Sequence, residues 1–322
     1  MNKTIIELLE KTGLNVIYEP EDFQREEIIL RDGRNAFIWV NQNDNHGILD
    51  SSFWEDESYY EEDYREEYSA NLNSYTKPKE HLNVYKDVNK RQFEQFKRFL
   101  NSETKFLEIG CSFGGILKFV NKKNLKSKSA IEPNKKDSSF CSKKYKNVNI
   151  INSIFENHNF EKQKFNLIVS FEVLEHVYNI DTFLKKVSTV LEENGIVNFE
   201  VPNHNDALLR NYEVERYKTF YYHKAHIHYF TPASLKKIFS QYGINGDVYS
   251  FQMYPFLNQI YWVYNNQPQP SAELALNYPD VDKNKNSVNK EISKFLNKIN
   301  IQYQKLMNKE LSGDCLVFVG KK

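Results

Sequence analysis

A glycine-rich segment at 106–115 has the residue types and spacing of a turn that binds a nucleotide-like ligand. An apolar run ends at Gly110, and Gly114 follows four residues later. Glycine has no Cβ, so the backbone of such a turn can approach a ligand closely. A helix beginning there would also point its free N–H groups at the ligand. The spacing is G-x-x-x-G, whereas nicotinamide dinucleotide sites carry G-x-G-x-x-G, which disfavours NAD.

Three further segments follow the ends of expected strands, and each suits one part of a nucleotide-like ligand. Glu132 ends the strand after the glycine turn, and a carboxylate there can accept both hydroxyls of a ribose. Ser153 and Ile154 follow the third strand and are placed to flank an adenine ring. Phe171 and Glu172 end the fourth strand and begin the segment Glu-Val-Leu-Glu-His-Val. Four features in register indicate one ligand site rather than a chance glycine loop.

Histidines supply the candidate acid–base chemistry. His223, His226 and His228 lie within six residues of one another, and His176 follows the fourth strand. A histidine titrates near neutral pH and can take the proton of an acceptor hydroxyl, so His226 and then His176 are the first candidates for a general base. Close histidines can also bind zinc or nickel, but their loop contains no carboxylate, and we expect no metal. Structural roles are the alternatives: a cluster capping the helix at Thr231, and a loop-holding His176.

The elements that must position these residues alternate between strands and helices from residue 81 onward. We expect strands at 106–109, 129–132, 148–151, 167–171, 196–201, 247–253 and 314–320, and helices at 80–100, 114–122, 135–144, 180–191, 232–242 and 289–311. Such alternation specifies a parallel sheet with helices on both faces, whose ligands bind at the carboxyl ends of the strands. One domain, 81–322, is therefore expected, with a polar and aromatic loop at 203–230 and an insertion at about 252–311. Within the insertion, residues 264–290 are expected to be mobile.

Residues 1–80 differ from the rest and are expected to form an N-terminal extension that ends near Pro78. Short strand-like pieces precede an acidic segment in which Tyr60, Tyr64 and Tyr68 repeat every four residues, the spacing of a helix. We favour a helix whose tyrosines pack on the main domain. A lid over the substrate is a compatible role for the same segment.

The order of the four segments resembles the class I S-adenosylmethionine-dependent methyltransferases, strongly over about 85–200 and loosely beyond. The Glu-Val-Leu-Glu-His-Val segment is especially specific to that superfamily. The resemblance implies an α/β fold with a Rossmann-like, doubly wound and mostly parallel seven-stranded sheet, and S-adenosyl-L-methionine as the cofactor. The cofactor residues carried over are Glu108, Gly110, Cys111, Ser112, Gly114, Glu132, Pro133, Ser153, Ile154, Phe171 and Glu172. Family members often have Asp at the position of Ser153.

The His-x-His-x-Phe-Thr pattern after His223 is similar to the C-terminal half of sugar and antibiotic methyltransferases. In sugar C-methyltransferases a similar histidine loop contributes the base, and His226 is the matching residue. The resemblance thus implies methyl transfer to a small-molecule acceptor, a hydroxyl of a sugar or nucleotide-linked sugar, in carbohydrate or glycosylated-metabolite biosynthesis. Many relatives begin with a cysteine-ligated zinc module. This chain has no cysteine before Cys111, so any such module is expected to lack metal.

Composition narrows the alternatives. Lys and Arg together number 43, as do Asp and Glu, so the basic excess of nucleic-acid-binding proteins is missing and an RNA methyltransferase is disfavoured. Three scattered cysteines suit a reducing cytoplasm, and the N-terminus has no long apolar run that could anchor it in a membrane. The expected partner is a small molecule, with no nucleic acid and no membrane, and a homodimer is compatible. A quinone- or lipid-type O-methyltransferase and a non-catalytic cofactor-binding regulator are the alternative functions.

Overall fold

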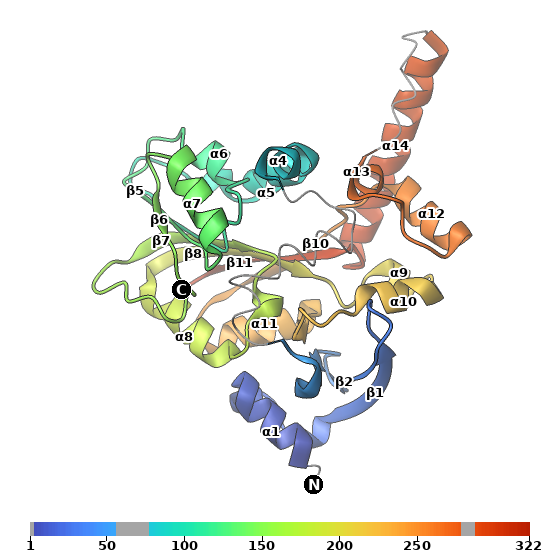
Figure 1. Ribbon diagram of the computed structural model, residues 1–322, viewed down its shortest axis with the longest axis horizontal. Helices are drawn as coiled ribbons and strands as arrows, with labels where there is room; N and C mark the ends of the chain where they lie inside the picture. Colours follow the sequence, from blue (N-terminus) through green and yellow to red (C-terminus); the bar gives the residue numbers. More distant parts are fainter. Residues whose placement is uncertain (1–2, 56–76, 278–286) are drawn as a thin grey trace.

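The structure, a computed structural model, describes residues 3–55, 77–277 and 287–322 (Figure 1). Its helices are α1 (Lys3–Thr12), α4 (Pro78–Val84), α5 (Lys86–Phe96), α6 (Leu117–Val120), α7 (Lys135–Lys144), α8 (Ile180–Val190), α9 (Ala207–Arg210), α10 (Glu215–Tyr221), α11 (Pro232–Gln241), α12 (Phe256–Asn265), α13 (Ala272–Leu276) and α14 (Ser287–Lys309). Its strands are β1 (Phe23–Ile29), β2 (Asn35–Asn41), β3 (Gly47–Leu49), β4 (Lys105–Ile109), β5 (Ser127–Ile131), β6 (Asn149–Ile151), β7 (Phe165–Phe171), β8 (Leu191–Pro202), β9 (His228–Tyr229), β10 (Asn245–Phe251) and β11 (Cys315–Lys321). The acidic segment with Tyr60, Tyr64 and Tyr68 lies outside these ranges, and so does the hypothesis of a lid.

Seven strands form the central sheet in the order β10-β11-β8-β7-β4-β5-β6. The five strands from β8 to β6 run parallel, and β11 pairs antiparallel with both β8 and β10. The order reverses at β4, because β5 lies on one side of it and β7 on the other. The predicted doubly wound, mostly parallel seven-stranded sheet is confirmed. A doubly wound sheet binds ligands beside such a reversal, at the carboxyl ends of the strands.

Helices cover both faces of this sheet, and each face has its own hydrophobic cluster. On one face α5, α6 and α7 pack through side chains such as Phe96, Leu117 and Cys141. On the other face α8 and α11 pack through Phe183 and Phe239. Side-chain caps begin several of these helices: the Asn134 side chain caps α7, the Asn179 side chain caps α8, and Thr231 forms the predicted cap of α11. Capping satisfies N–H groups that have no partner within the helix.

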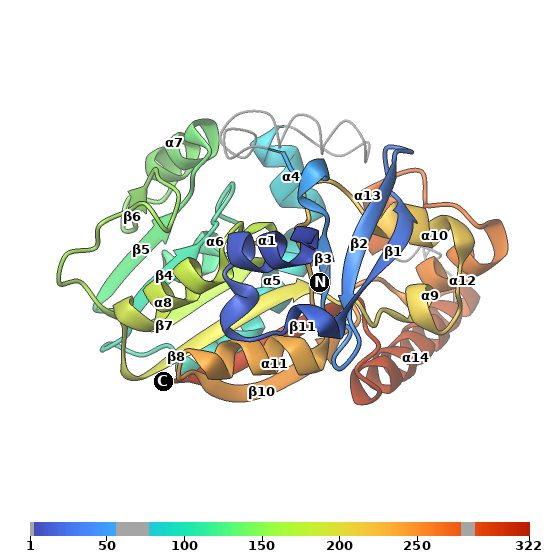
Figure 2. The same cartoon turned by 90° about the horizontal axis from the view of Figure 1, so that it is seen from below.

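The N-terminal residues pack on the face of the sheet that α8 and α11 cover (Figures 1 and 2). Ile5, Leu8 and Leu9 of α1 belong to the same hydrophobic cluster as the sheet residues. A second, four-stranded sheet has the order β1-β2-β3-β9, so its last strand comes from the histidine-rich segment. This sheet therefore draws strands from both sides of residue 80. A domain boundary there stays a prediction.

Three stretches differ from the elements expected. The helix expected at 80–100 is two helices, α4 and α5, which meet at Tyr85, and the helix expected at 114–122 is reduced to α6. The polar loop expected at 203–230 contains α9, α10 and β9, because its aromatic residues pack into a cluster of their own with β2. The insertion expected at about 252–311 contains α12 and α13, which were not expected, and α14 begins at Ser287, within its segment 264–290; residues 278–286 lie outside the described ranges.

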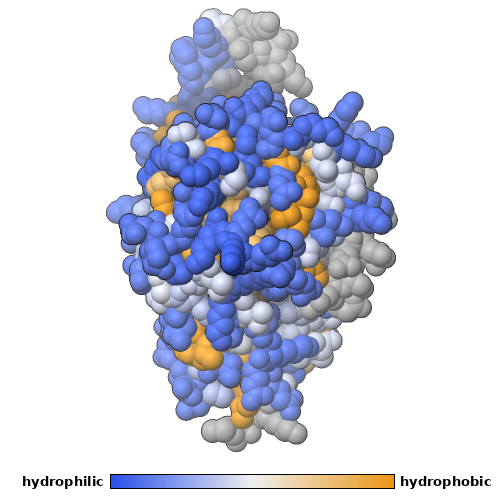
Figure 3. Space-filling view, turned by 90° about the vertical axis from the view of Figure 1, so that its left-hand side faces the viewer, coloured by the Kyte–Doolittle hydropathy of each residue, from blue (hydrophilic) through white to orange (hydrophobic). Residues whose placement is uncertain are grey.

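None of the described helices has the length and apolar character needed to cross a membrane. The face of the molecule drawn in Figure 3 is largely hydrophilic, and hydrophobic residues appear on it only in separate places.

Candidate functional site

A cavity of about 550 Å³ lies at the carboxyl ends of β4, β5 and β7. Its size is within the usual range of small-molecule sites. Eight of the eleven residues predicted to bind the cofactor line it: Gly110, Ser112, Glu132, Pro133, Ser153, Ile154, Phe171 and Glu172. Of the four predicted catalytic histidines, His176 is also on its wall. The cavity is therefore where the predicted cofactor residues and one candidate base meet.

The glycine turn that begins the cavity depends on backbone conformations that few residues adopt. Gly110 has φ of +77°, and a Cβ at this position would overlap Val173, so glycine is required. Ser112 and Glu172 also have positive φ, +46° and +55°, although neither is glycine. Such conformations cost of order 1 kcal/mol or more each and persist where the surroundings enforce them. Both strained residues lie on the cavity wall.

Glu132 is held rigidly at the edge of the cavity. Its carboxylate accepts hydrogen bonds from the backbone N–H groups of Ser112, at 2.8 Å, and Asn134, at 3.0 Å. The side chain is 7 % exposed, so it is fixed yet still reaches the cavity. Each carboxylate oxygen has more than one acceptor site, which leaves capacity for hydroxyl groups of a ligand.

Three predicted cofactor residues lie behind the wall rather than on it: Glu108, Cys111 and Gly114. Gly114 has φ of +73°, and its position beside Tyr145 and Cys141 leaves no room for a Cβ, so it serves the packing of the turn on α7. Glu108 is buried on β4, and burial raises its pKa well above the usual value. Its Oε2 atom has no hydrogen-bond partner among the described residues.

Glu172 lies beside a second buried acid, Glu200, at the end of β8. Arg91 donates two hydrogen bonds to Glu200, at 2.6 and 2.9 Å, and Gln92 donates a third at 2.8 Å. Burial alone would raise the pKa of Glu200, but Arg91 and the glutamine donors hold it below its usual value. Burial first, and then the charge of Glu200, raise the pKa of Glu172 to about 8. The Glu200 cluster is thus a buried acid with its own cation.

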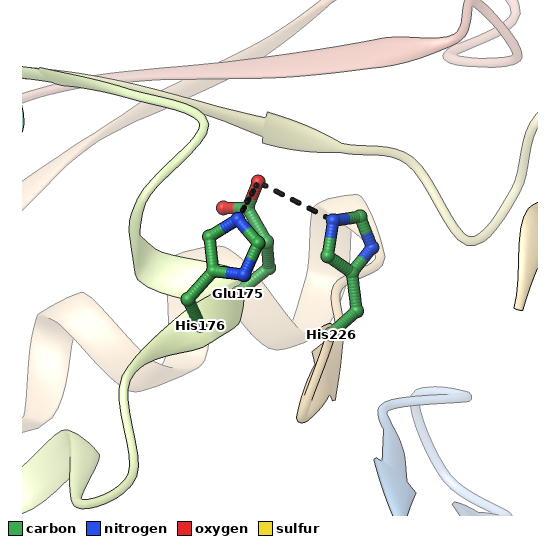
Figure 4. Close-up of side chains that lie close together, drawn as sticks. All are labelled: Glu175, His176 and His226. Carbon is green, nitrogen blue, oxygen red and sulfur yellow. Dashed lines mark ion pairs between the residues drawn. The ribbon is translucent and has the colours of Figure 1, made fainter. Parts of the chain in front are cut away.

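A second acid cluster lies behind His176 (Figure 4). Glu175 Oε1 is 3.7 Å from His176 Nε2 and 3.9 Å from His226 Nε2. His176 Nδ1 is 2.6 Å from the carbonyl oxygen of Ala225, and the centroids of the two histidine rings are 4.9 Å apart. Burial lowers the pKa of His176 to about 4 and that of His226 well below its usual value, and burial raises the pKa of Glu175.

The other two predicted histidines are farther from the cavity. The ring of His223 lies 3.7 Å, between centroids, from that of His226, and neither histidine is on the cavity wall. His228 is in β9, where its Nε2 is 3.0 Å from the carbonyl oxygen of Val177 and its ring stacks on His46. Burial lowers its pKa to about 3. A role of His223, His226 or His228 as general base stays a prediction, and the cavity is reached by His176 instead.

Sequence reasoning missed several residues of the cavity wall. Those from other segments are His81, Tyr85, Val88, Asn89 and Gln92 of α4–α5, and Met253 and Tyr254 after β10. Their spacing carries no chemical motif, so no signal in the sequence could have selected them. Glu175 could have been selected, because it is the second acid of the Glu-Val-Leu-Glu-His-Val segment and is 1 % exposed.

Comparison with solved structures gives distant likenesses only. A SAM-dependent methyltransferase from Thermotoga maritima is 17 % identical, with 74 % of this chain and 91 % of that chain covered and a TM-score of 0.46. A SAM-dependent methyltransferase from Archaeoglobus fulgidus is 16 % identical, with 81 % and 100 % covered and a TM-score of 0.49. No curated protein sequence matches this chain.

The family comparison covers most of the sheet domain. The family model described as a methyltransferase domain matches residues 60–247, more than half of the chain. That range contains the glycine turn, Glu132, the Glu172–His176 segment and the histidine loop. The chain therefore belongs to the methyltransferase domain family, within the class I S-adenosylmethionine-dependent methyltransferases, and S-adenosylmethionine is its cofactor.

Proposed function

We propose that this protein transfers the methyl group of S-adenosylmethionine to a hydroxyl of a small polar acceptor, a sugar or a nucleotide-linked sugar. One observation carries the proposal. A single cavity wall runs from Glu132, the candidate ribose acceptor, through Phe171 and Glu172 to His176. The candidate cofactor residues and one candidate base therefore line one space, which supports methyl transfer between two bound molecules.

The residues present fit the cofactor. Glu132 would accept the two ribose hydroxyls, since its carboxylate is fixed by backbone N–H groups and still reaches the cavity. Ser153 and Ile154 would flank the adenine, and Phe171 and Glu172 would border the methionine end. The bound cofactor supplies an activated methyl group on a sulfonium, so the protein has to align and desolvate rather than generate the reactivity.

His176 is the histidine best placed to meet the acceptor. Its Nδ1–H donates to the carbonyl oxygen of Ala225, which leaves the lone pair on Nε2. A hydroxyl that enters the cavity can donate a hydrogen bond to this side of the ring. His226, the first candidate by sequence, would act behind His176 through Glu175. The acceptor oxygen forms the new bond to carbon and gives its proton to Nε2 of His176, while the sulfonium–methyl bond breaks and its electron pair stays on sulfur.

Polar side chains on the rest of the wall support an acceptor with many hydroxyl groups. They include Asn89, Gln92, Asn157, Asn179 and Thr182. Amide and hydroxyl groups both donate and accept hydrogen bonds, which suits a sugar better than a quinone or lipid ring.

Calorimetry with S-adenosylmethionine tests the donor half of the proposal. We expect binding by the wild type and a loss of about tenfold or more in Glu132→Gln, because hydrogen bonds to a charged group contribute about 1.5–3 kcal/mol. Glu103→Gln is the matched control, since Glu103 is an exposed acid that pairs with Lys126. Equal affinity in wild type and Glu132→Gln would refute the assigned ribose contact.

A screen of nucleotide sugars with methyl-labelled cofactor tests the acceptor half. Transfer of label to a sugar hydroxyl is expected. Transfer only to quinones, lipids or amines would overturn the acceptor class while leaving the methyltransferase assignment intact.

A further inference from the structure

Glu175 is a buried acid with neither a lysine nor an arginine among its ion-pair partners in the described residues. Its side chain is 1 % exposed, and neither carboxylate oxygen has a hydrogen-bond partner among the described residues. Within the same residues its ion-pair partners are His176 and His226. Burying a charged carboxylate without a partner costs several kcal/mol of folding free energy, so the carboxylate needs a nearby cation or has to take up a proton.

The two imidazole nitrogens stand where metal ligands would stand. The ligand atoms of Glu175, His176 and His226 all lie within 4.8 Å of one another. The Glu175–His176 and Glu175–His226 separations of 3.7 and 3.9 Å are too long for hydrogen bonds. A zinc ion lies about 2.0–2.2 Å from nitrogen and oxygen ligands, which then stand roughly 3.0–3.5 Å apart. The two glutamate–histidine separations would therefore each have to shorten by less than about 1 Å.

The orientation of His176 is also that of a metal ligand. Its Nδ1–H is directed to the carbonyl oxygen of Ala225 at 2.6 Å, so Nε2 carries the lone pair that faces Glu175. Metal-bound histidines nearly always donate their second ring N–H in this way. The backbone N–H of Ile227 donates to the carbonyl oxygen of Glu175 at 2.8 Å. Two hydrogen bonds thus fix the segment of Glu175 and His176 against the segment of His226.

Nearby positive side chains are engaged elsewhere. Lys224 pairs with Glu55 at 2.7 Å. The Nε–H of Arg31 donates to the carbonyl oxygen of Phe220 at 2.6 Å, and its guanidinium lies over the ring of Phe220. Neither cation forms an ion pair with Glu175 among the described residues. From the sequence alone a metal is disfavoured, because the histidine loop contains no carboxylate. In the folded chain the carboxylate of Glu175, from another segment, lies beside His226.

We propose that Glu175, His176 and His226 bind one divalent transition-metal ion, such as Zn²⁺. Two histidines and one glutamate are a ligand set of catalytic zinc, which keeps a further position open. Because His176 is on the cavity wall, the open position would face the cavity. With the ion on Nε2, His176 would no longer accept the hydroxyl proton itself; the ion would bind the acceptor hydroxyl and lower its pKa, and the proton would pass to water. Only this role of the ion rests on the proposed function.

Metal binding by the full-length protein tests the site directly. The purified chain is stripped with a chelator, dialysed, and titrated with ZnCl₂ by calorimetry, with bound zinc measured by elemental analysis. We expect one equivalent per chain, and a loss of affinity of about tenfold or more in Glu175→Gln and in His226→Ala. His158→Ala is the matched control, because His158 is a partly exposed histidine outside the cluster. Its affinity should equal that of the wild type.

Two further measurements keep the outcome clear. Calorimetry with S-adenosylmethionine on every variant shows whether it is folded, and a variant that fails is replaced by His226→Gln. Co²⁺ added to the stripped wild type reports imidazole ligation by its visible absorption spectrum. Absence of zinc binding by the wild type, or unchanged affinity in both ligand variants, would overturn the proposal. Zinc binding without methyl transfer to any sugar would refute the proposed function and leave the metal site standing.

Discussion

Glu200 and Glu175 are both buried acids close to the cavity, but the fold compensates them differently. Glu200 receives two hydrogen bonds from Arg91 and further ones from Gln92 and Gln95. Glu175 faces two imidazoles at 3.7 and 3.9 Å. A guanidinium stays charged when buried, whereas a buried imidazole gives up its proton. One cluster therefore carries a permanent internal cation, and the other offers three ligand atoms.

Under the proposal, the Glu200 cluster is structural and the Glu175 cluster binds an ion. Arg91 and Glu200 join α5 to the end of β8, so their pair fixes the helix that contributes to the cavity wall. Four donor groups, two of Arg91 and one each of Gln92 and Gln95, share the two carboxylate oxygens of Glu200. The oxygens of Glu175 have no hydrogen-bond donor among the described residues and remain available.

The largest effect is expected when Glu200 loses its cation. Arg91→Met should lower the free energy of unfolding by about 3–5 kcal/mol, because a buried carboxylate is left unpaired. Urea denaturation measures it. Arg98→Met, which removes an exposed arginine nearby, should change the stability by less than about 0.5 kcal/mol. Equal effects of the two substitutions would show that the Glu200 cluster is not a structural ion pair.

The next effect is the stabilisation of the Glu175 cluster by an added ion. Zinc at 100 times its dissociation constant should raise the free energy of unfolding of the wild type by about 2.7 kcal/mol. Thermal denaturation with and without ZnCl₂ measures this stabilisation. At the same zinc concentration Glu175→Gln should lower it to about 1.4 kcal/mol or less, and Arg91→Met should keep it. An undiminished zinc effect in Glu175→Gln would place the ion elsewhere.

A smaller effect is expected from pH. In the wild type the pKa of Glu200 is held low by Arg91, whereas in Arg91→Met burial would raise it. An acid whose folded pKa lies above its unfolded pKa loses stability as pH rises, so the deficit of Arg91→Met should shrink as pH falls from 7 to 5. We expect recovery of about 1–2 kcal/mol in urea denaturation. A constant deficit would mean that Glu200 does not take up a proton.

The smallest effect is expected for Glu175→Gln, which is compared with the same substitution at Glu200. In the absence of metal, Glu175→Gln should change the free energy of unfolding by less than about 1 kcal/mol, because no cationic partner is lost. The identical change Glu200→Gln should cost several times more, since it leaves Arg91 buried without its counter-charge. Urea denaturation of the two metal-free variants provides the comparison. A large loss in Glu175→Gln would assign a structural role to this acid.

Most of the fold and one side of the candidate site followed from local pattern. Apolar runs bounded by turns predicted all seven strands of the central sheet, and the glycine turn and Glu132 were predicted at its carboxyl edge because they directly follow strands. Helix ends were less predictable. Tyr85 interrupts the helix expected at 80–100, and tertiary packing rather than periodicity decides where such a helix breaks.

The sequence by itself determined which residues lie at the carboxyl ends of the strands, because Gly110, Glu132 and Glu172 each directly follow a strand. These residues form the cofactor edge of the sheet. It could not bring Arg91 to Glu200, 109 residues away, nor His226 to Glu175. Such pairs depend on how the helices and the second sheet dock, and β9 ties the histidine loop to the N-terminal strands. The cofactor edge of the sheet could therefore be predicted from the sequence. The cluster of Glu175, His176 and His226 could not, because only the folded chain brings its residues together.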